Sequence, residues 1–171
     1  MKQLIFISGP MGAGKTTAAR GLLDALPHSV MLDGDWCWEQ GNHWDYCEDN
    51  KAMVMDNIVT LLGRFLDNPH FETVIFSWVM QLSEIKEELL QRLGEEHDFE
   101  LYEITLTADA DTLRGRILAG GRTEADAERA VAYLDFFKDA KNIIDTGRIK
   151  QPYVVDAMLR VLNDGAPRCN C

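Results

Sequence analysis

The stretch that decides the fold is "LIFISGPMGAGKTTAARGLLDAL", residues 4–26. It opens within a continuous apolar run at 3–8, which is typical of a strand buried on both faces. Glycines dominate the next six residues. From Lys15 onward the apolar side chains recur with helical spacing, until Pro27 ends the segment. The stretch therefore predicts a strand, a glycine-rich loop and a helix in immediate succession.

The glycine-rich loop, residues 9–16, fits the pattern G-x-x-x-x-G-K-[ST]. Glycines let consecutive backbone N–H groups converge on phosphate oxygens, and the N-terminus of the following helix adds positive charge. Lys15 supplies a charge for the β- and γ-phosphates, and the Thr16 hydroxyl is a ligand for Mg²⁺. The sequence thus predicts a phosphate loop that binds ATP and Mg²⁺. The predicted nucleotide contacts in it are Gly9, Pro10, Met11, Gly12, Ala13, Gly14, Lys15, Thr16 and Thr17.

The rest of the chain alternates strand-like and helix-like patterns. Strands are expected at 3–8, 29–33, 73–78, 99–107 and 142–145, and helices at 15–26, 50–67, 82–96, 108–121, 124–140 and 152–163. Ser83 is expected to cap the third of these helices. Such a series predicts one α/β domain over residues 1–165, followed by a flexible tail at 166–171.

The overall charge narrows the range of partners. The chain of 171 residues carries a formal net charge of -11. This acidity disfavours nucleic acid and anionic membranes, which both attract clustered cations. No apolar run reaches about 18 residues, so no transmembrane helix is expected. The four cysteines lack the spacing of a disulfide framework, which predicts reduced thiols and a cytoplasmic location, and the terminal Cys-Asn-Cys is interpreted as a frayed end.

Two carboxylates follow the second predicted strand in "MLDGDW", residues 31–36. Because parallel strands end at the same edge of a sheet, Asp33 and Asp35 are expected to lie near the phosphates. A carboxylate there can hold a Mg²⁺-bound water or accept the proton of an attacking hydroxyl. We assign Asp35 as the base and Asp33 to the magnesium or to orientation. The sequence is also compatible with the reverse assignment and with a simple Asp-Gly turn.

Together these motifs resemble the small P-loop kinases of the adenylate-kinase-like type, such as gluconate kinase, adenylylsulfate kinase, shikimate kinase and chloramphenicol phosphotransferase. The resemblance runs from the loop at 9–16 to the last predicted helix. It implies a P-loop NTPase fold of three α/β/α layers, with a five-stranded parallel sheet in the order 2-3-1-4-5. It also implies an acceptor-side cap at about 36–67 and a lid at about 119–127.

The resemblance also implies roles for two arginines in "LRGRILAGGR", residues 113–122. In the resembling enzymes, arginines on this helix and on the lid neutralise the charge that develops on the transferred phosphoryl group. Arg116 matches the helix position. Arg122 follows two glycines that suit a lid hinge, although the family spacing places the second arginine near position 120, where this chain has glycine.

Two further sites follow from the resemblance. Similar kinases cradle adenine with the loop after the fifth strand, where this chain has Asp145, Thr146 and Gly147. A plain strand-to-helix turn accounts for that loop equally well. The third strand ends at Ser77, where many P-loop NTPases carry aspartate. Gluconate-kinase-like proteins also carry serine there, and its presence disfavours a mechanical or switch-type ATPase.

The acceptor side is predicted between residues 33 and 80, where all the tryptophans of the chain fall. Aromatic faces suit a planar ring or the apolar face of a sugar, although core packing explains any single one. The same segment has nine acidic residues but only Lys51 and Arg64 as cations, too few for an arginine clamp on a phosphate or carboxylate. The predicted acceptor-binding residues are Asp35, Trp36, Trp38, Trp44, Ser77 and Trp78.

The sequence therefore predicts a kinase that transfers the γ-phosphoryl group of Mg·ATP to a hydroxyl of a neutral or cationic small molecule. A nucleoside, a sugar derivative or an antibiotic-like amphiphile fits that description. A nucleotide-binding regulatory protein with little catalysis is one alternative. A nucleotide or polynucleotide-end kinase is another, and the net charge of -11 counts against it. Either a monomer or a homodimer is compatible with the sequence.

Overall fold

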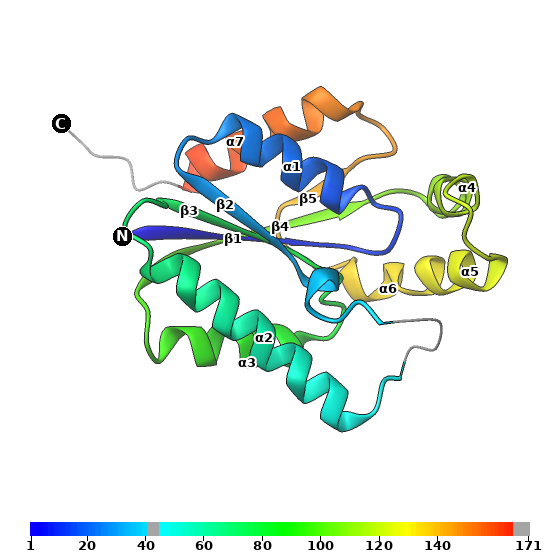
Figure 1. Cartoon of the computed structure of the whole chain (residues 1–171). Helices are drawn as coiled ribbons and strands as arrows, with labels where there is room; N and C mark the ends of the chain where they lie inside the picture. The colour runs from blue at the N-terminus through cyan, green and yellow to red at the C-terminus, as the bar shows by residue number, and fades with distance from the viewer. Residues whose placement is uncertain (41–44, 166–171) are drawn as a thin grey trace.

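The fold is built around a parallel sheet of five strands in the order β2-β3-β1-β4-β5 (Figure 1). The computed structural model describes residues 1–40 and 45–165. The strands are β1 (Lys2–Ser8), β2 (Ser29–Asp33), β3 (Thr73–Ser77), β4 (Phe99–Thr107) and β5 (Ile143–Asp145). The α/β class, the parallel sheet and the strand order expected from the sequence are confirmed.

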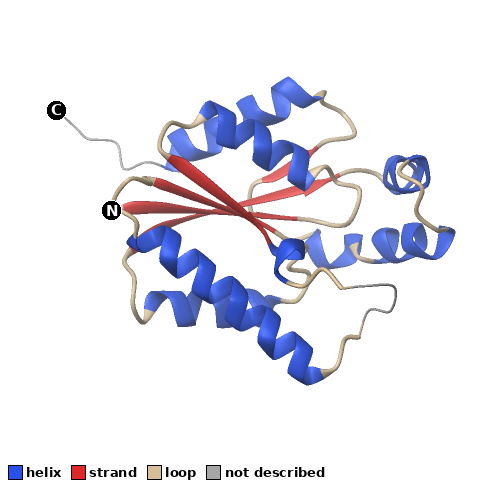
Figure 2. Cartoon of the chain, viewed as in Figure 1, coloured by secondary structure: helices blue, strands red, loops and turns tan. Residues whose placement is uncertain are grey.

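Helices cover both faces of the sheet and make it the middle of three layers (Figures 1 and 2). One face carries α1 (Lys15–Ala25) and α7 (Gln151–Gly165), and the other carries α2 (Glu48–Asp67) and α3 (Ser83–Gly94). The remaining helices lie toward the carboxyl ends of the strands: the 3-10 helix η1 (Gly34–Cys37), α4 (Ala110–Ala119), α5 (Glu124–Ala132) and α6 (Leu134–Phe137). None of the helices in the described ranges combines the length and the apolar character that a membrane-spanning segment requires.

The middle of the central strand β1, residues 4–7, is apolar because helices cover both faces of the sheet there. Ile5 and Ile7 pack in the cluster under α1 and α7, while Leu4 and Phe6 pack in the cluster under α2 and α3. All four side chains are buried. A strand covered on both faces has no position for a polar side chain until it ends. The phosphate loop thus begins where a strand with a buried, well-packed middle finishes.

Two expectations about helices are wrong. The segment 124–140 is not one helix, because α5 ends at Ala132 and α6 begins at Leu134. The two helices on either side of the break pack against different neighbours. Ala127 of α5 packs in a cluster with α4, while Phe137 of α6 is buried beside the sheet. Ser83 is not a cap either. It is the first residue of α3, and its hydroxyl donates to the Glu84 carboxylate instead of accepting from a backbone N–H.

Gly9 is a position where any side chain should destabilise the fold. Its φ is 140°, and a Cβ atom would lie 2.0 Å from the Leu106 carbonyl oxygen on β4. We expect Gly9→Ala to lower the free energy of unfolding by about 3 kcal/mol, because backbone strain adds to a clash with a buried strand. Urea unfolding followed by circular dichroism measures this.

Gly115→Ala is the matched control for this prediction. Gly115 lies inside α4, and a Cβ there meets no atom within 4 Å. Alanine is a better helix former than glycine, so this variant should gain up to about 1 kcal/mol. Equal unfolding midpoints for the two variants would contradict the assignment of Gly9 to a close approach of two backbones.

Candidate active site

The loop between β1 and α1 presents a set of backbone N–H groups that lack partners. Gly9, Gly12 and Gly14 take positive φ values of 140°, 82° and 88°, which glycine adopts readily. Helix α1 begins without a capping side chain. Within the described part of the chain, the amides of Gly12, Gly14, Lys15 and Thr16 donate no hydrogen bond. Unpaired N–H groups at a helix N-terminus form a binding site for an anion such as phosphate.

Lys15 folds back over this loop. Its Nζ donates a hydrogen bond of 3.0 Å to the Pro10 carbonyl oxygen. Burial lowers the pKa of Lys15 to about 8, while the carboxylates of Asp35 and Asp33 act in the opposite direction. Burial destabilises the charged form of this ammonium group, and an anionic ligand would stabilise it. Lys15 and the open amides therefore converge on the same kind of ligand.

The end of β2 places the acidic pair against this loop. The Thr16 hydroxyl donates to Asp33 Oδ2 at 2.7 Å, and Asp33 Oδ1 accepts a hydrogen bond of 3.1 Å from the Asp35 amide. Asp33 is buried, whereas Asp35 lies two residues further, in η1, and is exposed. Partial desolvation and the charge of Asp33 raise the pKa of Asp35, against the effect of Lys15. Asp33 is thus fixed by its partners, while Asp35 faces outward with a raised proton affinity.

The oxygen atoms around Thr16 fit a Mg²⁺ ion. Thr16 and Asp33 supply hard oxygen ligands, and Ser77 is paired with Asp33 across the sheet. The Ser77 hydroxyl is buried and has no hydrogen-bond partner among the described residues. In residues 1–40 and 45–165 no group of three or more His, Cys, Asp or Glu side chains could hold a metal. Mg²⁺ typically takes one or two protein ligands and completes its shell with phosphates and water, so this donor set suits it.

The two predicted arginines both contact the phosphate loop. Arg116 donates to the Thr146 hydroxyl at 2.8 Å, to the Thr146 carbonyl at 2.7 Å and to the Gly12 carbonyl at 3.2 Å. Arg122 places its guanidinium 3.0 Å from the Met11 sulfur, near enough for its charge to act on Lys15 and Asp35. The structure therefore brings Arg122 to the loop despite its unusual spacing, and it ties Arg116 to the loop after β5. A role for either in charge neutralisation stays a prediction.

Residues 145–147 form a tight turn that is joined to the phosphate loop. Asp145 Oδ1 accepts a hydrogen bond of 2.9 Å from the Gly147 amide. The buried Thr146 hydroxyl lies 2.9 Å from the Ala13 carbonyl and 3.0 Å from the Thr107 carbonyl. The Thr146 side chain is thus occupied in holding two loops together. Contact between this turn and a nucleobase stays a prediction.

The tryptophans predicted for the acceptor side have different surroundings. Trp36 follows Asp35 in η1 and is 52% exposed. Trp38 packs edge-on against Tyr46, with ring centroids 5.0 Å apart. Trp78 donates a hydrogen bond of 3.1 Å from Nε1 to Asp35 Oδ1. Trp44 lies outside the described residues, as do the predicted tail at 166–171 and its two cysteines.

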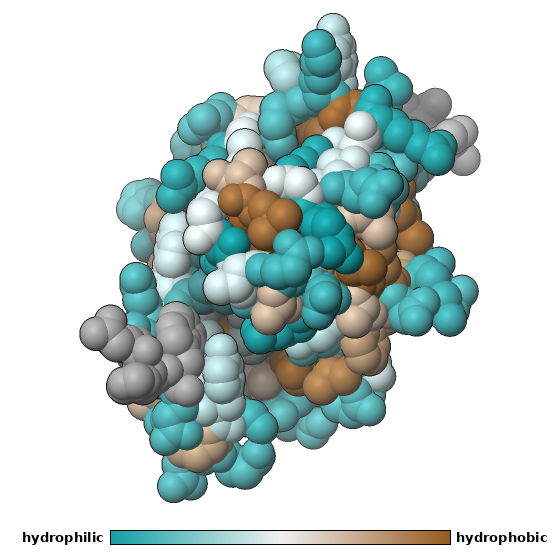
Figure 3. Space-filling model, turned by 90° about the vertical axis from the view of Figure 1, so that its right-hand side faces the viewer, coloured by the Kyte–Doolittle hydropathy of each residue, from teal (hydrophilic) through white to brown (hydrophobic). Residues whose placement is uncertain are grey.

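Figure 3 looks at the end of the molecule that faces right in Figure 1, where the strands finish and the phosphate loop lies (Figure 3). Hydrophilic side chains surround smaller hydrophobic areas on this face. A cavity of about 480 Å³ opens between α3 and α6, and its lining includes Ser8, Met80, Thr105 and Phe136. Ser8 directly precedes the phosphate loop, so this cavity adjoins the site.

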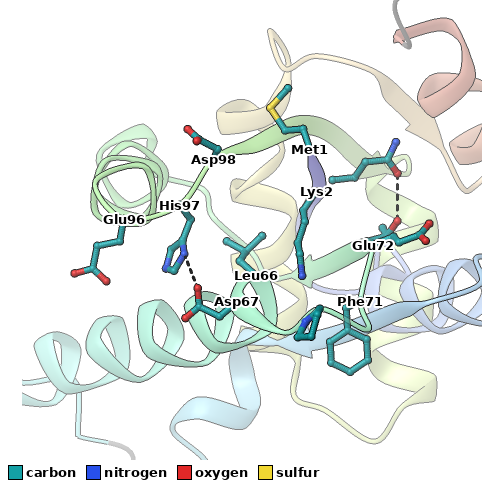
Figure 4. Close-up of a pocket in the computed structure, with 12 residues that line it drawn as sticks. Met1, Lys2, Leu66, Asp67, Phe71, Glu72, Glu96, His97 and Asp98 are labelled. Atoms are coloured by element: carbon teal, nitrogen blue, oxygen red, sulfur yellow. Dashed lines mark hydrogen bonds and ion pairs between the residues drawn. The ribbon is translucent and has the colours of Figure 1, made fainter.

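A second cavity, of about 720 Å³, lies at the opposite end of the sheet (Figure 4). It is lined by residues at the amino ends of the strands, among them Lys2, Glu72 and Asp98. Within it, His97 Nδ1 lies 3.2 Å from an Asp67 carboxylate oxygen. Ligands of parallel α/β sheets bind at the carboxyl ends of the strands, so this cavity is separate from the phosphate loop.

Sequence reasoning missed the contact between Trp78 and Asp35. It treated Trp78 as part of an acceptor wall, because a tryptophan near a loop of acids gives no sign of its hydrogen-bond partner. The two residues are separated by 43 positions in the chain. The sequence likewise gives no sign of the bond between the Thr146 hydroxyl and the Ala13 carbonyl of the phosphate loop.

A parallel sheet in this order, with a glycine-rich anion site between its central strand and the first helix, defines a P-loop nucleotide-binding protein. Residues 5–145 match the family model described as AAA domain, and the chain belongs to that family. No curated protein sequence matches the chain.

Solved structures of similar fold include several small P-loop kinases. A gluconokinase from Sinorhizobium meliloti 1021 has 16% identity and a TM-score of 0.69, over 95% of this chain and 92% of the other. Shikimate kinase from Acinetobacter baumannii, in complex with shikimate, has 16% identity and a TM-score of 0.63, over 98% and 97%. The Deinococcus radiodurans tunicamycin resistance protein has 18% identity and a TM-score of 0.68, over 98% of both chains. The resemblance to adenylate-kinase-like P-loop kinases is thereby confirmed at the level of the fold.

Proposed function

We propose that the protein is a kinase that transfers the γ-phosphoryl group of Mg·ATP to a hydroxyl of a small molecule. The observation that carries this proposal is the position of Asp35. It is an exposed carboxylate with a raised pKa, close enough to the partly buried Lys15 of the phosphate loop for their charges to interact. A protein that only binds nucleotide needs no such group. Asp35 therefore favours catalysis over the alternative of a regulatory nucleotide-binding protein.

The nucleotide would be held by groups that the structure leaves open. The loop amides and Lys15 would bind the phosphates, Thr16 and Asp33 would hold Mg²⁺, and the turn at 145–147 would lie against the base. Bound there, Mg·ATP supplies the phosphoryl group. The segment at about 119–127, with Arg122 over the loop, would close as a lid.

Asp35 then has a defined task. In the transfer, the acceptor oxygen bonds to the γ-phosphorus, the bond from that phosphorus to the bridging oxygen breaks, and ADP leaves. The proton of the acceptor hydroxyl passes to Asp35. Lys15 and Arg122 stabilise the negative charge on the group in transit. Asp33 cannot easily exchange roles with Asp35, because both of its carboxylate oxygens already accept hydrogen bonds from Thr16 and from the Asp35 amide.

The acceptor is proposed to be neutral or cationic. Of the two cations on the acceptor side, Lys51 pairs with Glu48 at 2.8 Å, and Arg64 lies near the end of α2 that leads to the amino end of β3. The lysines of the adjoining cavity, Lys86 and Lys141, both pair with Glu103. On the acceptor side, the described residues therefore offer no arginine clamp for a phosphate or a carboxylate. The cap, at about 36–67, would present Trp36 and Trp38 to an apolar or planar surface of the acceptor.

An acceptor panel tests this function. ADP release is measured with Mg·ATP and separate sets of nucleosides, neutral sugars, aminoglycosides, gluconate and nucleoside monophosphates, with Asp35→Asn as the control for contaminating kinases. We expect turnover in one of the first three sets. Preferential turnover of gluconate or of a nucleoside monophosphate would overturn the choice of acceptor. Tight Mg·ATP binding without turnover of any set would favour the regulatory alternative.

A further inference from the structure

Trp78 contacts the proposed base through the polar edge of its ring. Its Nε1 donates a hydrogen bond of 3.1 Å to Asp35 Oδ1. Among the described residues, Trp78 is the one hydrogen-bond partner of the Asp35 carboxylate, and the second oxygen, Oδ2, accepts none. A directional bond to one oxygen restricts the rotation of a carboxylate and leaves the other oxygen available.

The Trp78 ring packs directly against the backbone of Gly34, in the space that a side chain at position 34 would occupy. A Cβ atom at Gly34 would lie 2.4 to 2.8 Å from three atoms of the indole. The ring therefore rests directly on the backbone of the turn that carries Asp35. Any residue other than glycine at position 34 would push the indole away, so the glycine of the Asp-Gly-Asp sequence makes this contact possible.

The backbone of Trp78 is anchored equally well. Its amide donates a hydrogen bond of 3.1 Å to the Ile7 carbonyl near the end of β1, two residues before the phosphate loop. The ring also packs at a tilt against Phe76 of β3, with centroids 6.2 Å apart. Trp78 thus joins the end of β1, the end of β3 and the turn after β2. The three elements that would have to be in register for phosphoryl transfer meet at this one side chain.

From this geometry we infer that Trp78 is a positioning residue, which orients the Asp35 carboxylate so that Oδ2 faces the acceptor hydroxyl. The inference rests on the proposed function and deepens it, because it assigns Trp78 to the base instead of to the wall of the acceptor site. A positioned base gains rate through alignment, and a misplacement of about 1 Å can cost about a hundredfold.

Kinetics of Trp78→Phe test this inference. Phenylalanine keeps an aromatic ring on Gly34 but removes the N–H donor. We expect kcat to fall by about 10- to 100-fold, with KM for ATP and for the acceptor changed by no more than about twofold. In an Asp35→Asn background, the same substitution should change kcat by less than about twofold. An equal factor in both backgrounds, or a raised acceptor KM at constant kcat, would overturn the inference.

An NMR measurement separates this inference from the proposed function. In a ¹H–¹⁵N spectrum of the tryptophan side chains, the signal lost in Trp78→Phe belongs to Trp78. It should shift in Asp35→Ala and stay in place in Asp24→Ala, an exposed acid on α1. No shift in Asp35→Ala would overturn the role of Trp78 alone. A shift together with no phosphorylation of any acceptor would overturn the proposed function, and with it any catalytic role for the contact.

Discussion

Lys15→Ala is expected to lower kcat/KM for phosphoryl transfer by about a thousandfold. The loss is large because Lys15 is the partly buried cation of the phosphate loop, bonded to the Pro10 carbonyl at 3.0 Å, and no other lysine lies in the loop. Removing one preorganised group that stabilises developing charge typically costs about 10²- to 10³-fold in rate. A coupled assay of ADP release, with the acceptor found in the panel, measures the effect.

Arg20→Ala is the matched control, since it removes an exposed cation from the same helix. It should retain the activity of the original protein within about twofold, because exposed charges contribute little. Circular dichroism of both variants checks that the fold is kept. A Lys15→Ala protein with more than a tenth of the original kcat/KM would refute the assignment of the phosphate loop as the reaction centre.

Asp35→Asn is expected to lower kcat by about 10²- to 10⁴-fold, which is the usual contribution of a general base. Binding of Mg·ATP should change by less than about twofold, because the proposed Mg²⁺ ligands are Thr16 and Asp33, which are hydrogen-bonded to each other, and not Asp35. Asparagine keeps the size of the side chain and can still accept from Trp78 Nε1, so the variant isolates the proton-accepting function. Single-turnover kinetics and calorimetric titration with Mg·ATP measure the two effects.

Asp33→Asn is the informative comparison for this prediction. It removes a charge that is hydrogen-bonded to Thr16, and it should weaken Mg·ATP binding as well as turnover. Asp24→Asn, at an exposed position of α1, should leave both unchanged. If Asp33→Asn spared nucleotide binding while Asp35→Asn abolished it, the two carboxylates would have the opposite roles.

The sheet and the phosphate loop could be predicted because their signals are local. Each buried strand is a short apolar run, and the loop combines glycines, a lysine and a threonine at fixed spacing. The end of α5 at Ala132 could not, because the pattern continues through Tyr133 and only packing against two different neighbours separates α5 from α6. Tertiary contacts override a local helical pattern in such places.

The candidate site was predictable in its parts but not in its connections. Lys15, Thr16, Asp33 and Asp35 lie in two short segments whose strands end at the same edge, and the structure brings them together. The bond from Trp78 to Asp35 depends on the twist of the sheet and on the rotamer of one ring, which no sequence pattern encodes.

The bond from Thr146 to the carbonyl of Ala13 joins residues 133 positions apart. Arg116 reinforces it by contacting Gly12 and Thr146 at once. The phosphate loop and the turn at 145–147 are therefore not independent modules, although they are far apart in the chain. A shortened protein that stopped before β5 would keep every residue of the glycine-rich motif but would lose Thr146, whose contacts with Ala13 and Arg116 support the shape of that motif.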